Sequence, residues 1–214
     1  MFKIMAHRRT GVLLHPSSLP GTSDQGKLNS EAFNFIDFLS SCSVTIWQIL
    51  PLGPTHEDNS PYQSYSSFAL NPKLLDLSML GSWDYLPKEN IKACLSSDSP
   101  LNANYLCFMH DANQYHLDLF KAFKKKNRLW LDDYALFSLL KSNHNEKPWF
   151  EWPPELRNRD PDTLITVTAK NTAKIDELKF EQFALFESWQ HIKNYASQKD
   201  IVIFGDIPLF VSHD

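Results

Sequence analysis

The sequence has few cysteines and no excess of positive charge. Its 214 residues include three cysteines, Cys42, Cys94 and Cys107, whose wide spacings form neither a CxxC pair nor a zinc-binding pattern. This usage predicts reduced thiols in a cytoplasmic protein. Lys and Arg number 21 against 25 Asp and Glu, which leaves a formal charge of −4. We therefore expect no nucleic acid and no membrane surface among its partners.

Long apolar runs and nucleotide-binding glycine motifs are also missing. No stretch approaches the roughly 20 apolar residues of a membrane helix. Residues 1–10 carry Lys3, Arg8 and Arg9 but lack the apolar run of a secretory signal. Neither GxGxxG nor a Walker sequence is present, which argues against a nucleotide site. Apolar residues make up 43% of the chain and charged residues 21%, a composition typical of a globular protein.

Three short apolar runs predict buried strands. They span residues 11–14, 44–50 and 201–204, and proline or glycine follows each run closely. Apolar residues at helical spacing between the first two runs predict a helix over about 30–42, with Ser30 as its N-cap. A strand, a helix and a strand in succession make a βαβ unit, so we expect the strands to be parallel.

Further helices are predicted between the second and third strands. Residues 113–126 and 132–142 each form a helical pattern, the second capped by Asp132. The basic run 124–126 is interpreted as the solvated end of the first of these helices, where cations suit the helix dipole. A long helix over about 172–197 precedes the last strand.

The predicted organisation has three parts. Residues 1–72 hold the first two strands and a long loop, 73–165 form an inserted, mostly helical subdomain, and 166–214 hold the last helix and the third strand. Alternating strands and helices indicate an α/β fold with a parallel sheet. Doubly wound sheets and (β/α)8 barrels both begin in this way, and the apolar pattern does not separate them.

The carboxyl ends of parallel strands are where such folds bind ligands. The segments at these ends are 15–20, 51–72 and 205–208, and loops as long as the second are usually functional or disordered. The aromatic residues in and after 51–72 argue against disorder. Asp206 directly follows the third apolar run, where a carboxylate would face a cleft. Its position alone leaves a helix cap or an ion-pair partner as alternatives.

These loop segments carry recognisable motifs. The chain contains, in order, HPSSLPG (15–21), WQILPLGPT (47–55), SPYQSYSSFA (60–69), WPPELR (152–157) and GDIPLFV (205–211). They resemble HPTSLPG, WQVLPLGPT, SPYQSFSAFAGNP, a WPEELR-type segment and GDIPIFV of the 4-α-glucanotransferases. That family is also called amylomaltases or disproportionating enzymes and forms glycoside hydrolase family 77. The resemblance spans the chain from Arg9 to Asp214.

The resemblance implies a fold and an incomplete catalytic apparatus. The family fold is a (β/α)8 TIM barrel with inserted subdomains, and this chain resembles its N-terminal portion, about three strands with an inserted helical subdomain. The family's nucleophile Asp lies in an RIDHFRG-like motif, which is absent here, and its acid/base Glu comes later still. We therefore expect both catalytic carboxylates beyond residue 214, and no activity of the chain alone.

The resemblance also assigns sugar contacts. Ser60 and Tyr62 match family residues that contact bound glucan, and Asp206 matches the aspartate that contacts the donor sugar. Asp214 and His15 are weaker candidates. The implied reaction transfers α-1,4-glucan segments between maltooligosaccharides with retention, through a covalent glucosyl-enzyme, and needs no metal and no cofactor. Residues 56–59 read HEDN where many members have GYGD. Glu57 therefore stands in place of a tyrosine, and the resemblance does not imply an aromatic glucan contact at this position.

Alternatives to a glucan-transferring enzyme remain at this point. One is a non-catalytic glucan-binding fragment, or one half of a split enzyme that pairs with a separately encoded C-terminal half. Another is an unrelated doubly wound domain that carries the motifs by coincidence. Parallel strands with open edges and an uncovered face are prone to associate, so the isolated chain is expected to be poorly soluble or partly unfolded.

Overall fold

The chain divides into two compact units. The computed structural model describes residues 8–21, 25–208 and 212–214. One unit comprises 1–76 with 185–211 and is called the sheet unit here; the other comprises 77–184 with 212–214 and is called the helical unit. Part of the N-terminal stretch (1–7), part of the first loop (22–24) and Leu209, Phe210 and Val211 of the GDIPLFV motif lie outside the described residues.

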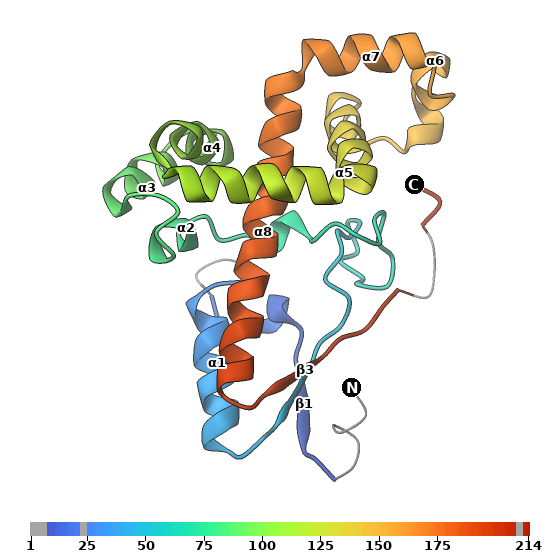
Figure 1. The fold of residues 1–214 in the computed structure, drawn as a ribbon. Helices are drawn as coiled ribbons and strands as arrows, with labels where there is room; N and C mark the ends of the chain where they lie inside the picture. Colours follow the sequence, from blue (N-terminus) through green and yellow to red (C-terminus); the bar gives the residue numbers. More distant parts are fainter. Residues whose placement is uncertain (1–7, 22–24, 209–211) are drawn as a thin grey trace. The chain divides into compact units, whose positions relative to one another are not determined.

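The sheet unit contains the predicted parallel sheet (Figure 1). Strands β1 (Gly11–Leu13), β2 (Ile46–Gln48) and β3 (Val202–Phe204) lie in the order β1-β2-β3, and both pairs are parallel. The register places Leu13, Gln48 and Phe204 in one row across the carboxyl edge. The α/β prediction is confirmed, although each strand is shorter than its apolar run.

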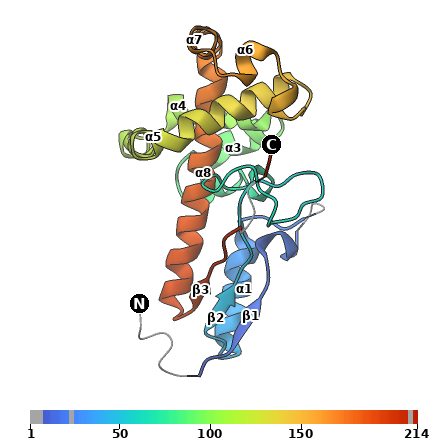
Figure 2. The ribbon, with the colours of Figure 1, turned by 90° about the vertical axis from the view of Figure 1, so that its right-hand side faces the viewer.

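Two helices cover one face of this sheet, α1 (Ser30–Ser41) and the second half of α8 (Thr172–Gln198), as Figure 2 shows. Trp47 of β2 is fully buried against them. Its ring centroid lies 5.2 Å from that of Phe35 on α1 and 6.4 Å from that of Trp189 on α8. The Trp47 indole N–H donates to the carbonyl of Leu14 at 2.8 Å, so no polar group of this ring is buried without a partner.

The N-cap of α1 is Asn29, and the prediction of Ser30 is one residue late. The Asn29 side chain accepts from the Glu31 N–H at 3.0 Å and donates to Asp76 at 3.0 Å. Asn is as good an N-cap as Ser, because its side-chain oxygen also reaches the first free N–H groups of a helix. Ser30 is instead the first residue of the helix.

The other face of the sheet is open in the described residues, which contradicts the prediction of buried strands. Leu13 is 53% exposed and Phe204 47% exposed. Successive side chains of a strand point to opposite faces, so the neighbours of Trp47 in sequence point away from α1 and α8. An unbroken apolar run predicts burial on both faces, but no described element covers this second face.

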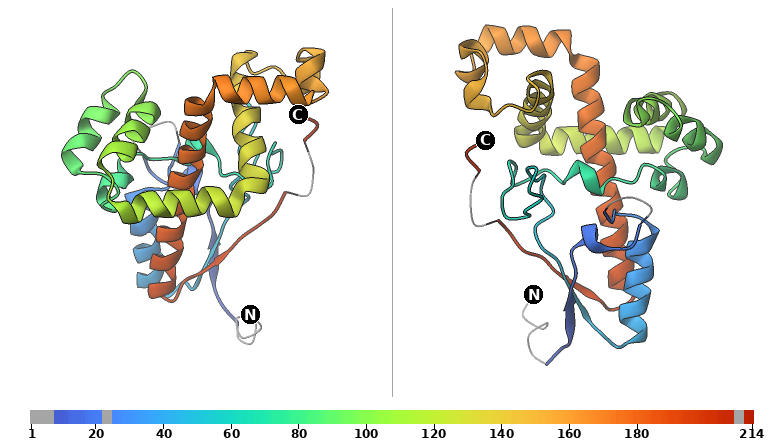
Figure 3. Two further views of the ribbon diagram at one scale, coloured as in Figure 1. Left: turned by 45° about the horizontal axis from the view of Figure 1, so that its top comes forward. Right: turned by 180° about the vertical axis from the view of Figure 1, so that it is seen from behind.

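The helical unit is built from short and long helices (Figure 3). They are α2 (Met79–Ser82), α3 (Lys88–Leu95), α4 (Pro100–Asp111), α5 (Gln114–Asn143), α6 (Pro154–Arg157), α7 (Pro161–Lys170) and the first half of α8. Phe108 on α4 packs 4.9 Å from Phe180 on α8, and Phe120 on α5 packs 5.2 Å from Phe183, between ring centroids. These four rings form an aromatic core.

One continuous helix, α5, replaces the two helices predicted over 113–126 and 132–142. No glycine or proline interrupts residues 114–143, so no residue type breaks the helix. Asn127 satisfies its own side chain within the helix, donating to the Phe123 carbonyl at 3.0 Å and accepting from Trp130 at 3.1 Å. The predicted cap, Asp132, is inside α5 and pairs with Lys179 at 2.6 Å.

The basic run 124–126 therefore lies in the middle of α5, and its interpretation as a helix end is wrong. Lys124 reaches across to α8, where its ammonium lies 2.9 Å from Asp176, and it also sits 4.4 Å from the centre of the Phe120 ring. Lys125 and Lys126 are exposed. Among the described residues, no helix combines the length and the apolar character needed to cross a membrane.

Burial along α1 yields a stability prediction with an internal control. Ile36 is 0% exposed and Phe38, on the same helix, is 58% exposed. We expect Ile36→Ala to lower the free energy of unfolding by about 2–5 kcal/mol, because it leaves a cavity under the sheet. Phe38→Ala should change it by about 0.5 kcal/mol or less. Urea unfolding followed by tryptophan fluorescence measures both. Equal losses would mean that α1 does not pack as described.

Candidate functional site

The candidate site lies at the carboxyl edge of the sheet. The parallel register aligns the ends of β1, β2 and β3, so the segments that begin at His15, Ile49 and Gly205 leave the sheet side by side. Two backbone bonds extend this alignment by one residue, from Leu14 N–H to Gln48 O at 3.0 Å and from Ile49 N–H to Phe204 O at 2.9 Å. Segments far apart in sequence are thereby brought together.

The long loop 51–72 is closed on itself by backbone hydrogen bonds. The Asn71 N–H donates to the Leu52 carbonyl at 2.8 Å, and Thr55 and Ser64 form an antiparallel bridge inside the loop. Gly53 lies against Ser64 so closely that a Cβ at this position would come 2.5 Å from the Ser64 hydroxyl oxygen. The loop is therefore packed around a buried serine.

Tyr62 is presented by a tight turn within this loop. The Gln63 N–H donates to the Ser60 carbonyl at 3.2 Å, which closes a turn over Ser60–Gln63 with Pro61 at its second position. Proline is favoured there because its fixed φ matches the turn. The Ser60 N–H donates to the Asp58 carboxylate at 3.1 Å, which fixes the entry to the turn. The SPYQ motif thus forms a turn that sets the position and direction of the Tyr62 side chain.

The Tyr62 hydroxyl donates a hydrogen bond of 2.7 Å to the Asp206 carboxylate. The other carboxylate oxygen of Asp206 accepts from the Ile207 N–H at 2.8 Å. The hydrogen bond to Asp206 raises the pKa of Tyr62 above its usual value. Asp206 is exposed, so its carboxylate retains lone pairs that can accept from a ligand hydroxyl.

His15 joins the loop after β1 to the loop after β2. A carbonyl can only accept, so the ring N–H at Nε2 donates to Pro51 O at 3.2 Å. Nδ1 then accepts from the Ser17 N–H at 3.2 Å and from its hydroxyl at 2.7 Å. Burial lowers the pKa of His15, against a smaller raising effect of the bond to Pro51, which favours this neutral form. His15 therefore positions loops in this structure.

A hollow of about 150 Å³ lies between these loops, lined among others by His15, Gly53, Asn59 and Pro61. It is smaller than cavities that enclose drug-sized ligands, so a ligand would lie over it rather than inside it. A larger hollow of about 680 Å³ lies at the amino-terminal edge, around Arg8, Thr45 and Asp200. Ligands of parallel α/β folds meet the carboxyl edge, so we assign the site to the smaller hollow.

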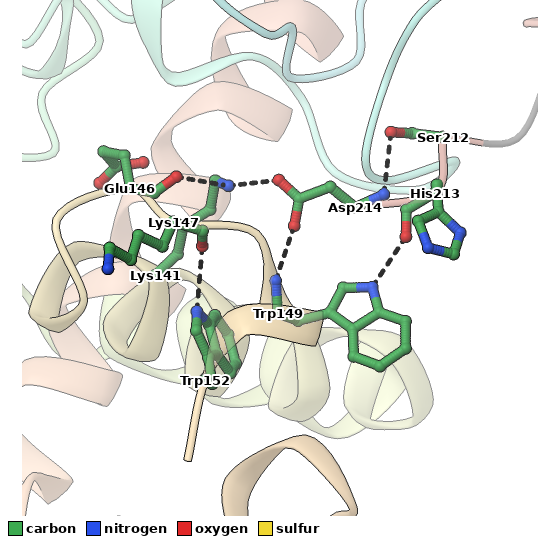
Figure 4. Close-up of polar contacts among 8 residues, drawn as sticks. All are labelled: Lys141, Glu146, Lys147, Trp149, Trp152, Ser212, His213 and Asp214. Carbon is green, nitrogen blue, oxygen red and sulfur yellow. Dashed lines mark hydrogen bonds and ion pairs between the residues drawn. The ribbon is translucent and has the colours of Figure 1, made fainter. Parts of the chain in front are cut away.

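Asp214 lies in the helical unit, engaged by protein groups (Figure 4). One carboxylate oxygen forms an ion pair with Lys141, and the other accepts from the Trp149 N–H at 3.1 Å. The side chains of Lys141 and Asp214 are 10% and 14% exposed. Lys141 also donates to the Glu146 carbonyl at 3.2 Å, and the Trp149 indole donates to His213 O at 2.8 Å.

The structure thus brings together Tyr62 and Asp206, with Ser60 in the same turn and His15 at the base of the loops. The motifs do not indicate the ion pair between Lys141 and Asp214. The sequence signal for it is a lysine among the buried apolar residues of α5. Among the described residues, no group of three or more His, Cys, Asp or Glu side chains is placed to hold a metal ion.

Comparisons with known proteins agree with the motifs. The family model of 4-alpha-glucanotransferase, glycoside hydrolase family 77, matches residues 14–214. The chain is 36% identical to the 4-alpha-glucanotransferase of Synechocystis sp. over 222 residues, covering 97% of the chain and 44% of that protein. It is 37% identical to that of Thermus thermophilus over 217 residues, covering 97% and 43%.

A solved structure is similar over the same extent. The amylomaltase from Streptococcus agalactiae in complex with acarbose superposes with a TM-score of 0.84 at 29% sequence identity. The superposition covers 97% of this chain and 45% of the amylomaltase chain. The chain therefore spans less than half the length of the relatives that it matches.

The neutral state of His15 predicts a pH dependence. Because its pKa is lowered in the folded state, the unfolded chain binds this proton more readily, and stability rises with pH. The contribution is complete above about pH 6.5, the unfolded value, and is lost as the pH falls below it. Urea midpoints at pH 7.5 and 5.5 should differ less in His15→Gln than in the parent chain. Identical differences would contradict the assignment.

The Lys141–Asp214 pair predicts a large stability effect. Lys141→Met leaves a poorly solvated carboxylate without its cation, so we expect a loss of about 3–5 kcal/mol in the free energy of unfolding. Arg159→Met is the matched control, since it breaks the Arg159–Asp133 pair, whose side chains are both more than half exposed. It should cost at most about 1 kcal/mol. Similar urea midpoints for the two variants would show that the buried pair is not formed.

Proposed function

The chain belongs to the 4-alpha-glucanotransferase family, and from this premise we propose that it forms the sugar-contacting N-terminal part of an enzyme that transfers α-1,4-glucan segments between maltooligosaccharides. The three strands would be the first three of a (β/α)8 barrel, with residues 73–165 inserted between the second and the third. The carboxyl edge, where Tyr62 and Asp206 lie, is the face at which such barrels carry their active sites.

The observation that supports this proposal is the hydrogen bond from Tyr62 to Asp206. The carboxylate is exposed and accepts from two protein donors, Tyr62 and Ile207, while its remaining lone pairs can accept from sugar hydroxyls. A charged acceptor makes the stronger hydrogen bonds. The half-buried tyrosine ring offers an apolar face against which a glucose ring can stack. Ser60 would add a hydroxyl from the same turn.

The chemistry of transfer would come from residues outside these 214. A retaining mechanism needs two carboxylates about 5–5.5 Å apart, one as nucleophile and one as acid and then base. Asp206 is bound by a tyrosine hydroxyl and a backbone N–H, an arrangement suited to holding a sugar rather than attacking one. The sequence contains no RIDHFRG-like motif. Asp206 and Tyr62 are therefore binding residues, and the 214-residue chain alone has no transferase activity.

The residues of this chain would bind and orient the donor glucan, and no metal or redox cofactor takes part in that task. The cysteines are free thiols in the described structure, in keeping with the cytoplasmic location that we propose for the protein.

A separately encoded C-terminal half is the second candidate, and it would account for apolar surface that the sheet unit leaves exposed. Leu13, Phe204 and Ile207 leave apolar surface exposed beside the carboxyl edge of the sheet. A partner that continued the sheet beyond β3 would cover this surface and add the missing carboxylates. Mixing the chain with such a half would then restore glucan transfer.

Calorimetric titration with maltooligosaccharides tests the proposal. We expect binding by the purified chain, and a loss of affinity of about tenfold in Asp206→Asn, because about 1.4 kcal/mol separates a charged from a neutral acceptor here. Tyr62→Phe should weaken binding about three- to tenfold through the lost hydroxyl. Tyr115→Phe, at an exposed tyrosine of the helical unit, is the control and should bind as the parent chain does.

Two outcomes would contradict the proposal. A flat titration at millimolar sugar would remove the assigned sugar contacts. Release of glucose from maltotriose by the purified chain, above a mock preparation, would show that the chemistry does not depend on residues outside the 214.

A further inference from the structure

Two cysteines of the helical unit face each other across a helical hairpin. Cys94 lies near the end of α3 and Cys107 near the end of α4, and their sulfur atoms are 2.8 Å apart. The distance is about 0.8 Å longer than a disulfide bond, so little backbone movement separates the two thiols from a covalent link. Wide spacing in the sequence gave no sign of this pair.

A second contact fixes the register of the two helices. The Asn90 side chain donates to the Asp111 carboxylate at 2.7 Å. Asn90 lies one helical turn before Cys94, and Asp111 lies one helical turn after Cys107. Both contacts therefore lie on the same faces of the antiparallel pair α3–α4. The packing of α3 against α4 therefore places the two thiols opposite each other, and their contact does not depend on side-chain rotation alone.

The two thiols differ in their access to solvent. Cys94 is 4% exposed, and burial raises its pKa to about 11. Cys107 is half-buried, and Cys42, in the sheet unit, is exposed. A reagent from solution therefore meets Cys107 before Cys94. Such a pair, one accessible thiol and one buried thiol behind it, matches the arrangement of a reacting and a resolving cysteine.

We propose that Cys94 and Cys107 form a redox-active dithiol that low-molecular-weight disulfides, such as oxidised glutathione, convert reversibly into an intrachain disulfide between α3 and α4.

The exchange proceeds in two balanced steps. The Cys107 thiolate attacks one sulfur of the oxidised glutathione, which forms a mixed disulfide and releases one glutathione thiolate. The Cys94 sulfur then attacks Cys107 Sγ, forms the intrachain disulfide and displaces the second glutathione thiolate. The two thiol protons pass to the two glutathione molecules. The dithiol loses two electrons and the reagent gains them.

The test is oxidation of the intact chain by oxidised glutathione, followed by alkylation with iodoacetamide in urea and mass spectrometry of the peptides. We expect a cross-linked peptide pair that contains Cys94 and Cys107, which dithiothreitol separates again. Cys42 should carry glutathione or the alkyl group and should not be part of the link. The folded chain should reach half oxidation at about tenfold less reagent than the chain in urea, since folding raises the effective concentration of one thiol near the other.

Single variants separate the roles of the two thiols. Cys94→Ser should stop at the mixed disulfide, with one glutathione retained on Cys107, and Cys107→Ser should leave Cys94 unmodified in the folded chain. Cys42→Ser is the matched control and should oxidise as the parent chain does. Recovery of Cys94 and Cys107 in alkylated form from the oxidised chain, or equal half-oxidation points with and without urea, would overturn the proposal. Neither result depends on glucan binding.

Discussion

The parallel register of β1, β2 and β3 is the constraint on which the candidate site depends. Parallel strands all end at one edge, so the loops that follow them share that edge whatever their length. Tyr62 and Asp206 are 144 positions apart in the chain, yet one hydrogen bond joins them. Most of the residues between them in sequence belong to the helical unit, so separation along the chain does not decide which residues meet at this edge. The sheet therefore brings the segments of the site together, and the turns within the loops orient their side chains.

The sequence predicted best those features of the structure that depend on neighbouring residues in the chain. Apolar runs predicted all three strands, and the motifs indicated the family, because strand formation and motif identity are both local properties. It failed at α5, where Asp132 looks like a cap but pairs with Lys179 instead. It also failed for the exposed face around Leu13, since an apolar run says nothing of which face is covered. Long-range pairings such as Lys141 with Asp214 were out of reach for the same reason.

Asp206 and Asp214 show how the surroundings of a residue give two aspartates different roles. Asp206 is exposed and accepts from a tyrosine hydroxyl and a backbone N–H, so its charge faces solvent and ligand. Asp214 is largely buried and its two oxygens contact Lys141 and the Trp149 backbone (Figure 4). The first arrangement suits recognition of hydroxyl groups, and the second holds a segment of chain in place. The motif already sets Asp206 apart, since Asp214 lies outside GDIPLFV, but only the structure shows what each carboxylate contacts.

The chain has only six glycines, and other residue types adopt the left-handed backbone conformation in its turns. Left-handed backbone is adopted by Ser43, Asn59, Asp84, Asn145, Glu146, Arg159 and Asp200, while no described glycine has a positive φ. Asn and Asp tolerate this conformation, but Ser43, in the connection from α1 to β2, Glu146 and Arg159 are held in it at a cost of about 1 kcal/mol each. A change to glycine at any of these three positions would remove that cost, so protein engineering has three positions at which to seek a more heat-resistant chain.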